Sequence, residues 1–204
     1  MSPPPAGERT PLGSILRGVL RIARGRVDGL DVFGGSRQGF IRSLTPITVV
    51  AAVVSIIMPG EIPVPDRLTT FFQLLSAFLW FSVGGHFFAR LWGREDHWLR
   101  YATALNWCQA LLPFMLGLVL LVPIFLASLL GLPPKAIVAL LFIASTVYMY
   151  WQYWFLARHG LGLSGVKSMI LVGVILTVHI AVTMLVAQLG GEGHGPMLPD
   201  GERT

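Results

Sequence analysis

The sequence predicts an all-α polytopic membrane protein with five transmembrane helices, preceded by an amphipathic interfacial helix. Three observations lead to this fold class: the composition, the spacing of the apolar segments and the distribution of the basic residues. Of the 204 residues, 54% are hydrophobic and only 12% are charged, whereas an ordinary soluble domain carries roughly 25% charged residues. So few charges cannot cover the surface of a water-soluble domain of this size, so the composition excludes that class.

Five apolar segments are long enough to cross a bilayer. A hydrocarbon core of roughly 30 Å needs about 20 mostly apolar residues in a helix, because lipid offers the backbone no hydrogen-bond partners. The first span is the weakest, since Arg42, Thr45 and Pro46 lie near its start, and the third is long enough to be tilted, with Pro113 and Pro123 as candidate kinks. The predicted spans cover residues 40–58, 68–91, 101–130, 136–157 and 166–189.

The basic residues predict the orientation of these spans. With five spans, Arg67, Lys135 and Arg203 fall on one side of the membrane, and the other twelve Lys and Arg residues fall on the side of the N-terminus: Arg9, Arg17, Arg21, Arg24, Arg26, Arg37, Arg42, Arg90, Arg94, Arg100, Arg158 and Lys167. Because cytoplasmic loops carry the excess of Lys and Arg, we expect a cytoplasmic N-terminus and an extracytoplasmic C-terminus. The preference for arginine over lysine fits a GC-rich bacterial genome, and we expect a multi-pass protein of a bacterium to lie in the inner membrane.

The parts outside the spans are short. Residues 1–10 are rich in proline and polar side chains, which predicts disorder. Residues 11–30 are expected to form an amphipathic basic cytoplasmic helix, and residues 31–189 the five-helix transmembrane domain. Residues 190–204 are expected to be a flexible extracytoplasmic tail.

The predicted N-terminal helix starts with Thr10 as its N-cap and a proline in its first turn. At about 100° per residue, Arg17, Arg21 and Arg24 fall on the face opposite to an apolar face. That pattern is typical of a helix in the membrane interface, with the arginines contacting anionic lipid headgroups. The alternative is a helix that packs on the inner ends of the spans. The apolar face consists of Leu12, Ile15, Leu16, Val19, Leu20, Ala23 and Val27.

Four polar residues inside the spans share one depth. At a rise of about 1.5 Å per residue, His86, Asn106, Gln109 and Gln152 lie roughly 8 to 12 Å inside the cytoplasmic edge. Polar residues in spans are costly and therefore candidates for function. We favour hydrogen bonds between helices, because no Asp, Glu, Lys or Arg lies in mid-span to carry a proton or an ion. The alternative is a small polar cavity or a lipid headgroup site.

No catalytic residue, metal site or cofactor is expected. His179 lies about 20 Å from the cytoplasmic edge and His86 about 8 Å, too different in depth to hold one haem, so His179 is interpreted as a core histidine bonded to a neighbouring helix. Ser164 matches the Gly-x-Ser-Gly of rhomboid proteases, but it precedes His179 on the same helix axis by about 22 Å. Ser164 is therefore interpreted as the N-cap of the last span. Cys108 is the single cysteine, so no intrachain disulfide can form.

Aromatic and glycine residues complete the pattern. The aromatic run from Tyr148 to Phe155 is typical of a membrane-interface belt at the inner end of the fourth span. Gly84, Gly85 and Gly173 would permit close contact between helices.

Three stretches carry a resemblance to a known family. They are Gly84 to Gly93, Trp98 to Ala102 leading to Leu111-Leu112-Pro113, and Tyr150-Trp151 through Leu163-Ser164 to Lys167. Over residues 40–189 the chain resembles the bacterial branch of the Yip family of five-span membrane proteins. The resemblance implies a non-enzymatic role. Eukaryotic members act in vesicle traffic and bind small GTPases through the cytoplasmic region. In this chain that region is short and arginine-rich, so we do not expect a GTPase as a partner.

The expected function is therefore non-enzymatic: a multi-pass membrane protein with a structural or interaction role. The expected partners are the bilayer, anionic lipid headgroups, and other membrane proteins or a second copy of the chain, with no nucleic acid. The alternative is a transporter or permease-like subunit that uses the four polar residues as a pathway. That alternative requires the four side chains to converge on a water-accessible cavity.

Overall fold

A computed structural model describes residues 11–57, 64–131 and 133–191, and in these ranges the fold is all-helical without a strand, as the sequence predicted. The residues predicted to be disordered at the N-terminus, 1–10, and most of the predicted tail, from 192 on, lie outside the described ranges. The elements are α1 (Leu12–Ala23), the 3-10 helix η1 (Val27–Val32), α2 (Arg37–Ile57), α3 (Val64–Leu91), α4 (Glu95–Leu129), α5 (Pro134–Gly160) and α6 (Gly165–Gly191).

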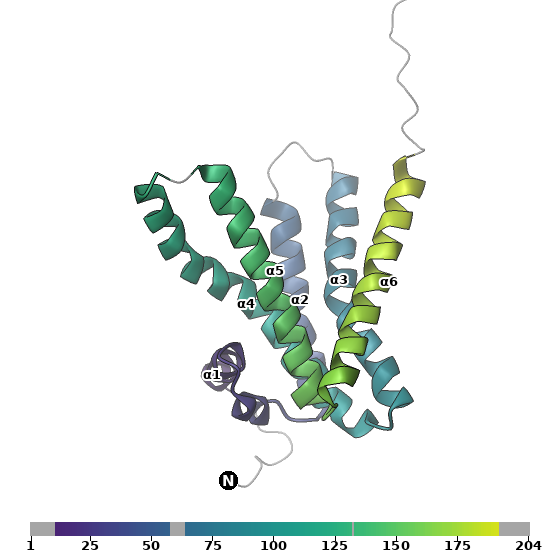
Figure 1. Cartoon of the computed structure of the whole chain (residues 1–204). Coiled ribbons are helices and arrows are strands. Elements are labelled where there is room, and N and C mark those ends of the chain that lie inside the picture. The colour runs from purple at the N-terminus through teal and green to yellow at the C-terminus, as the bar shows by residue number, and fades with distance from the viewer. Residues whose placement is uncertain (1–10, 58–63, 132, 192–204) are drawn as a thin grey trace, which may run out of the picture.

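The five long helices run back and forth between the same two ends of the molecule (Figure 1). The α1 and η1 elements lie at the lower end, together with the α3–α4 and α5–α6 turns. Four stretches are long and apolar enough to cross a membrane, and they match the first, second, fourth and fifth predicted spans. They are Arg37–Ile57, Arg67–Leu91, Lys135–Gly160 and Gly165–Leu185.

The third predicted span lies in α4, which is not among those four stretches. This helix has 35 residues, begins with Glu95 and Asp96, and continues in its backbone through Pro113 and Pro123. Its C-terminal half leans outward from α2, α3 and α6 in Figure 1. The described chain therefore has four candidate spans and a further long helix that joins the same two ends.

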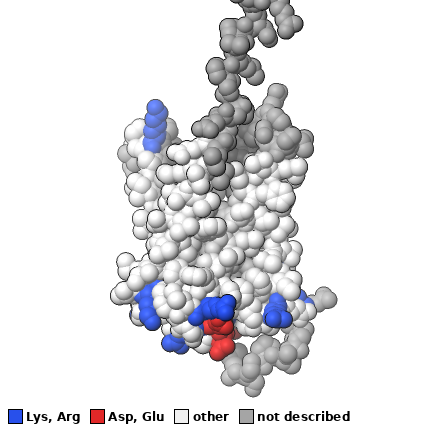
Figure 2. Space-filling model, turned by 90° about the vertical axis from the view of Figure 1, so that its right-hand side faces the viewer, with Lys and Arg blue, Asp and Glu red and all other residues white. Residues whose placement is uncertain are grey.

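Most of the apolar surface of the long helices is exposed. In α5 only 11% of the most apolar stretch is buried, and Val138, Phe142 and Ile143 at its upper end are exposed. Figure 2 shows the Lys and Arg side chains gathered mainly at the lower end, with an uncharged belt above them. Soluble monomers rarely expose apolar patches of this extent, so lipid is the solvent that this surface matches.

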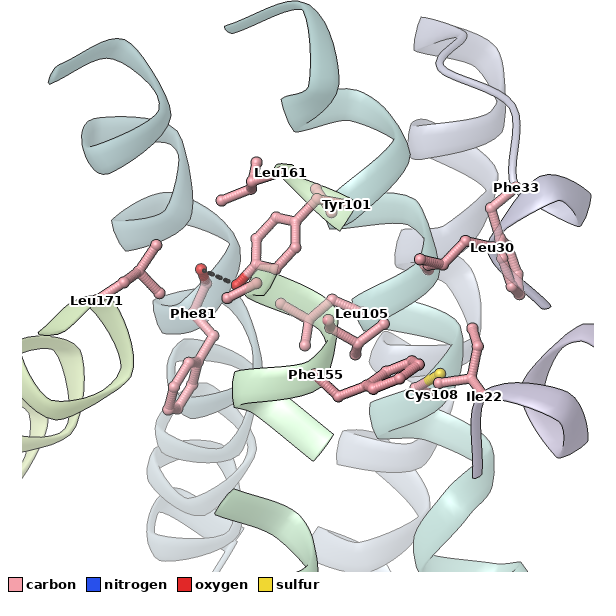
Figure 3. Packing of buried hydrophobic residues seen from close by; sticks show 14 of the residues in the cluster. Ile22, Leu30, Phe33, Phe81, Tyr101, Leu105, Cys108, Phe155, Leu161 and Leu171 are labelled. Atoms are coloured by element: carbon pink, nitrogen blue, oxygen red, sulfur yellow. Dashed lines mark hydrogen bonds between the residues drawn. The ribbon is translucent and has the colours of Figure 1, made fainter. Parts of the chain in front are cut away.

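The buried core lies in the half of the bundle nearest to α1 and centres on α4. Tyr101 is fully buried, and its hydroxyl lies 3.5 Å from the carbonyl oxygen of Phe81 on α3 (Figure 3). Its ring fits beside Gly85, because a Cβ built there would collide with the ring, and a Cβ built at Gly160 would lie 3.2 Å from the Tyr101 side chain. The glycines of α3 and α5 thus allow three helices to meet around one tyrosine.

Two of the three glycines predicted to permit close helix contact do so. A Cβ at Gly84 would lie 2.7 Å from Ile175 on α6, and Gly85 faces Tyr101 on α4. The prediction for Gly173 was wrong, since a Cβ built there meets nothing within 4 Å. This residue lies instead in an open groove of the surface.

The predicted single helix over residues 11–30 was also wrong, because the chain reverses after Ala23. Gly25 has φ 74°, a left-handed conformation that ends helices. Its N–H donates to the carbonyl oxygen of Ile22, and the N–H of Arg26 donates to that of Arg21, which together make a Schellman motif. The 3-10 helix then folds back on α1. The helix begins one residue later than predicted, at Leu12, and Thr10 lies outside the described residues.

Candidate functional site

The apolar side of α1 is divided between the protein core and the exterior. Ile15, Val19 and Ile22 are buried in the main hydrophobic core, where Figure 3 shows Ile22 pointing toward Cys108 of α4. The three leucines of the helix are exposed, with Leu12 68%, Leu16 41% and Leu20 36% accessible. One flank of α1 thus packs on the lower ends of the long helices, while the adjacent flank is exposed.

The three arginines predicted to contact lipid have different surroundings. Arg17 and Arg24 are exposed, next to the outward apolar flank. Arg21 lies 3.6 Å from the carboxylate of Asp28 in η1, and Arg26 donates two hydrogen bonds of 2.9 and 3.1 Å to the same carboxylate. The Asp28 carboxylate therefore ties α1 to η1 across the Schellman turn.

The hydrogen bonds from Arg26 and the charges of Arg26 and Arg21 hold the pKa of Asp28 below its ordinary value, although partial desolvation opposes them. Because the pKa of Asp28 is lowered in the folded state, the ionised carboxylate stabilises the packing of η1 on α1. This contribution is fully present at pH values above the unfolded-state pKa of about 3.9, and it is lost as the pH falls through the lower folded-state pKa.

We expect amide hydrogen exchange in residues 12–32, corrected for its intrinsic pH dependence, to be faster in Asp28→Asn than in the wild type at pH 6. At pH 3 the difference in exchange rate between Asp28→Asn and the wild type should be smaller, because the pH is then closer to the folded-state pKa of the wild-type carboxyl group. Asp31→Asn, at an exposed carboxylate of the same element, is the matched control and should exchange like the wild type. Equal exchange of Asp28→Asn and wild type at pH 6 would contradict the role of Asp28.

Among the four predicted polar residues, Asn106 joins three helices. Its Nδ2 atom donates to Ser43 Oγ of α2 at 2.9 Å, and its Oδ1 atom accepts from Ser82 Oγ of α3 at 2.8 Å. All three side chains are buried, and Ser43 also donates to the carbonyl oxygen of Phe40. The Asn106 side chain therefore links α4 to α2 and α3.

Gln109 of α4 and Gln152 of α5 are both buried. Gln109 Nε2 lies 3.4 Å from the hydroxyl of Tyr153. In the described part of the chain, Gln109 Oε1 and Gln152 Nε2 are buried side-chain atoms without a hydrogen-bond partner.

His86 does not join the other three residues. It is exposed on α3, and its ring lies 4.5 Å from the ring of Trp98 on α4. His86 is thus exposed, whereas Asn106, Gln109 and Gln152 are buried. Within the described ranges, no group of three or more His, Cys, Asp or Glu residues could hold a metal ion.

His179 lies on α6, and Ser164 directly precedes that helix. His179 is partly exposed rather than a core residue, and its ring lies 5.9 Å from that of Trp80 on α3. The prediction that Ser164 caps the last span is confirmed, because its Oγ accepts a hydrogen bond of 3.4 Å from the N–H of Lys167 in the first turn of α6.

Two residues of the aromatic run of α5 hold the ends of neighbouring helices. The Tyr148 hydroxyl donates to the carbonyl oxygen of Ala23 at 3.0 Å, which fixes the end of α1. Trp154 Nε1 donates to the carbonyl oxygen of Gly165 at 3.1 Å, which fixes the start of α6. These roles could not be read from spacing, since the signal in the sequence was only an aromatic cluster near a helix end.

An apolar groove lies between α5 and α6, with a volume of about 440 Å³. We call it the α5–α6 groove. It is open to the exterior, and none of the four polar residues discussed above lines it. Its lining residues are Tyr150, Trp151 and Trp154 of α5 and Met169, Val172, Gly173 and Leu176 of α6.

The arrangement as a whole offers hydrogen bonds between helices, an amphipathic basic helix and an apolar groove. No family model, curated protein or solved structure matches the chain.

Proposed function

We propose that this chain is a non-enzymatic multi-pass protein of the bacterial inner membrane, with a structural or interaction role at the lipid surface. The observation that carries the proposal is the exposed flank of α1. Leu12, Leu16 and Leu20 point outward on a helix whose other flank is anchored to the bundle, and Arg17 and Arg24 are exposed beside them. A helix with this pattern lies in the interface, with apolar side chains in lipid and arginines at anionic headgroups.

A five-span topology with a cytoplasmic N-terminus fits the same arrangement. It is supported by the course of α4 between the same two ends as its neighbours (Figure 1). It is supported also by charge, since Arg67 and Lys135 lie in the upper turns of α3 and α5, whereas the other described basic residues belong to the lower end. The positive-inside rule then assigns the lower end to the cytoplasm. A Yip-like relationship is part of the proposal and rests on the three sequence stretches that suggested it.

The proposal is tested with the full-length chain in nanodiscs. We replace Leu16 with cysteine in a Cys108→Ala background and label it with an environment-sensitive fluorophore. In discs that contain anionic phosphatidylglycerol, we expect blue-shifted emission, because the label at this position enters the lipid. The double variant Arg17→Gln with Arg24→Gln should shift the emission to the red, since each arginine near an anionic surface contributes about 1 kcal/mol.

The matched control is Arg90→Gln with Arg94→Gln, which removes the same charge from the same end of the molecule but not from α1. It should leave the emission unchanged. A label at Leu16→Cys that emits as it does in water, in anionic and in zwitterionic discs alike, would remove the interfacial role of α1.

A further inference from the structure

We propose that Tyr148 of α5 is a positioning residue for α1, because its hydroxyl holds the C-terminal end of that helix in the orientation that turns the leucines outward. The hydroxyl donates to the carbonyl oxygen of Ala23 at 3.0 Å. This role rests on the proposed lipid contact of α1, and it assigns the orientation of that contact to one side chain of a long helix.

The Tyr148 hydroxyl completes the pairing of the carbonyl groups at the end of α1. The last four carbonyl groups of a helix have no partner within the helix. In α1, the Schellman turn supplies backbone N–H groups to three of them, those of Leu20, Arg21 and Ile22. The fourth carbonyl group, that of Ala23, accepts the hydrogen bond from Tyr148. A phenol of α5 is thus part of the C-cap of α1.

The hydrogen bond from Tyr148 connects two parts of the molecule that otherwise meet through apolar contacts. Within the described residues it is the one hydrogen bond that joins α1 or η1 to a long helix, since their other hydrogen bonds lie within this pair of elements. Trp151 lies against the same turn, because a Cβ built at Gly25 would be 3.4 Å from its ring. The ring centroids of Tyr148 and Trp151 are 5.6 Å apart. The two aromatic residues therefore support the end of α1 from α5.

Apolar burial alone distinguishes the two flanks of α1 poorly. Ile15 and Val19 are buried, and the residues that follow them, Leu16 and Leu20, are exposed. Consecutive residues are about 100° apart around a helix, so a rotation of that size would bring the leucines to the core in place of the other two. Apolar burial has no preferred direction, whereas a hydrogen bond requires its donor and acceptor to be aligned. The bond from Tyr148 therefore favours the observed rotation of α1.

The residues next to Ala23 are those proposed to meet the membrane surface. Leu20 lies three residues before it on the exposed flank, and the exposed Arg24 follows it directly. Leu12, at the other end of the helix, lies about 12 Å from Leu20 along the axis at 1.5 Å per residue. Loss of the bond from Tyr148 should therefore move Leu20 more than Leu12.

The test uses the full-length chain in nanodiscs that contain phosphatidylglycerol, in the Cys108→Ala background. An environment-sensitive fluorophore is attached at Leu20→Cys in one protein and at Leu12→Cys in another. Tyr148→Phe removes the hydroxyl and keeps the ring. We expect it to shift the emission of the label at Leu20→Cys to the red, and that of the label at Leu12→Cys much less. One hydrogen bond corresponds to about a fivefold change in the ratio of docked to undocked helix ends.

The matched control is Tyr150→Phe, the same substitution two residues further along α5. Tyr150 is exposed, and its hydroxyl makes no hydrogen bond within the described residues. This control should leave the emission of both labels unchanged. A general loss of stability would shift both labels alike, so equal shifts at Leu20→Cys and Leu12→Cys in Tyr148→Phe would overturn the positioning role.

The same measurement separates this role from the lipid contact itself. Wild-type labels that emit as they do in water would refute the lipid contact of α1, and the role of Tyr148 with it. Blue-shifted wild-type labels that stay unchanged in Tyr148→Phe would refute the role of Tyr148 alone and leave the lipid contact standing.

Discussion

Gly85→Leu is expected to give a protein that unfolds well below the wild-type temperature, with a loss of stability of about 3 kcal/mol, at the upper end of the usual cost of overpacking a core. The reason is the ring of Tyr101, which already occupies the space that a side chain at Gly85 would need. The tyrosine is fully buried and is confined from α5 by Gly160. It cannot move aside without separating α3 from α4 or α5.

Cys108 provides the measurement for Gly85→Leu. It is the single cysteine and is fully buried, so a thiol-reactive fluorogenic maleimide reports its exposure as the protein is heated. Gly117→Leu is the matched control, because its side chain enters open space and leucine has the higher helix propensity. Adding Tyr101→Ala to Gly85→Leu should cost less than the sum of the two single changes, since they share one space. If Gly85→Leu unfolds at the same temperature as the wild type, the close packing around Tyr101 is contradicted.

The long helices could be predicted because the length of an apolar segment and the residues that end a helix are both read from neighbouring positions in the sequence. The predicted second span ends at Leu91, as α3 does, and Gly93 follows with a positive φ. The end of α1 within residues 11–30 was not predicted, because apolar residues keep the spacing of a helix beyond that point. Gly25 was the signal in the sequence, and the Schellman motif that it allows ends α1.

The candidate site was harder to predict, because the depth of a residue in a span does not give the direction in which it points. Asn106 and His86 share a depth, yet Asn106 is buried among three helices and His86 is exposed on the outside of α3. The partners of Asn106 were missed because serines are common and small, and Ser43 and Ser82 gave no signal of their own. Gly173 was misjudged for a related reason, since a glycine signals close contact or open space equally well.

Asn106→Leu is expected to lower the stability by about 1 to 2 kcal/mol, at the upper end of measured hydrogen bonds between membrane helices. Leucine has a similar shape, so the loss comes from the two hydrogen bonds. Ser43 keeps its bond to the carbonyl oxygen of Phe40, but Ser82 loses Asn106 Oδ1, the acceptor for its hydroxyl. A buried hydroxyl left without a partner carries the cost of its desolvation. The measurement is again maleimide labelling of Cys108 on heating.

A buried hydroxyl that loses its partner costs more stability than the removal of both partners. Ser82→Ala added to Asn106→Leu removes the orphaned hydroxyl, so the double variant should be more stable than Asn106→Leu alone. Thr103→Val is the control on the same helix, because its hydroxyl bonds within α4 to the carbonyl oxygen of Leu99 at 2.7 Å and joins no second helix. It should shift the unfolding temperature much less than Asn106→Leu. If Asn106→Leu and Thr103→Val unfold alike, the bonds to Ser43 and Ser82 do not hold α2, α3 and α4 together.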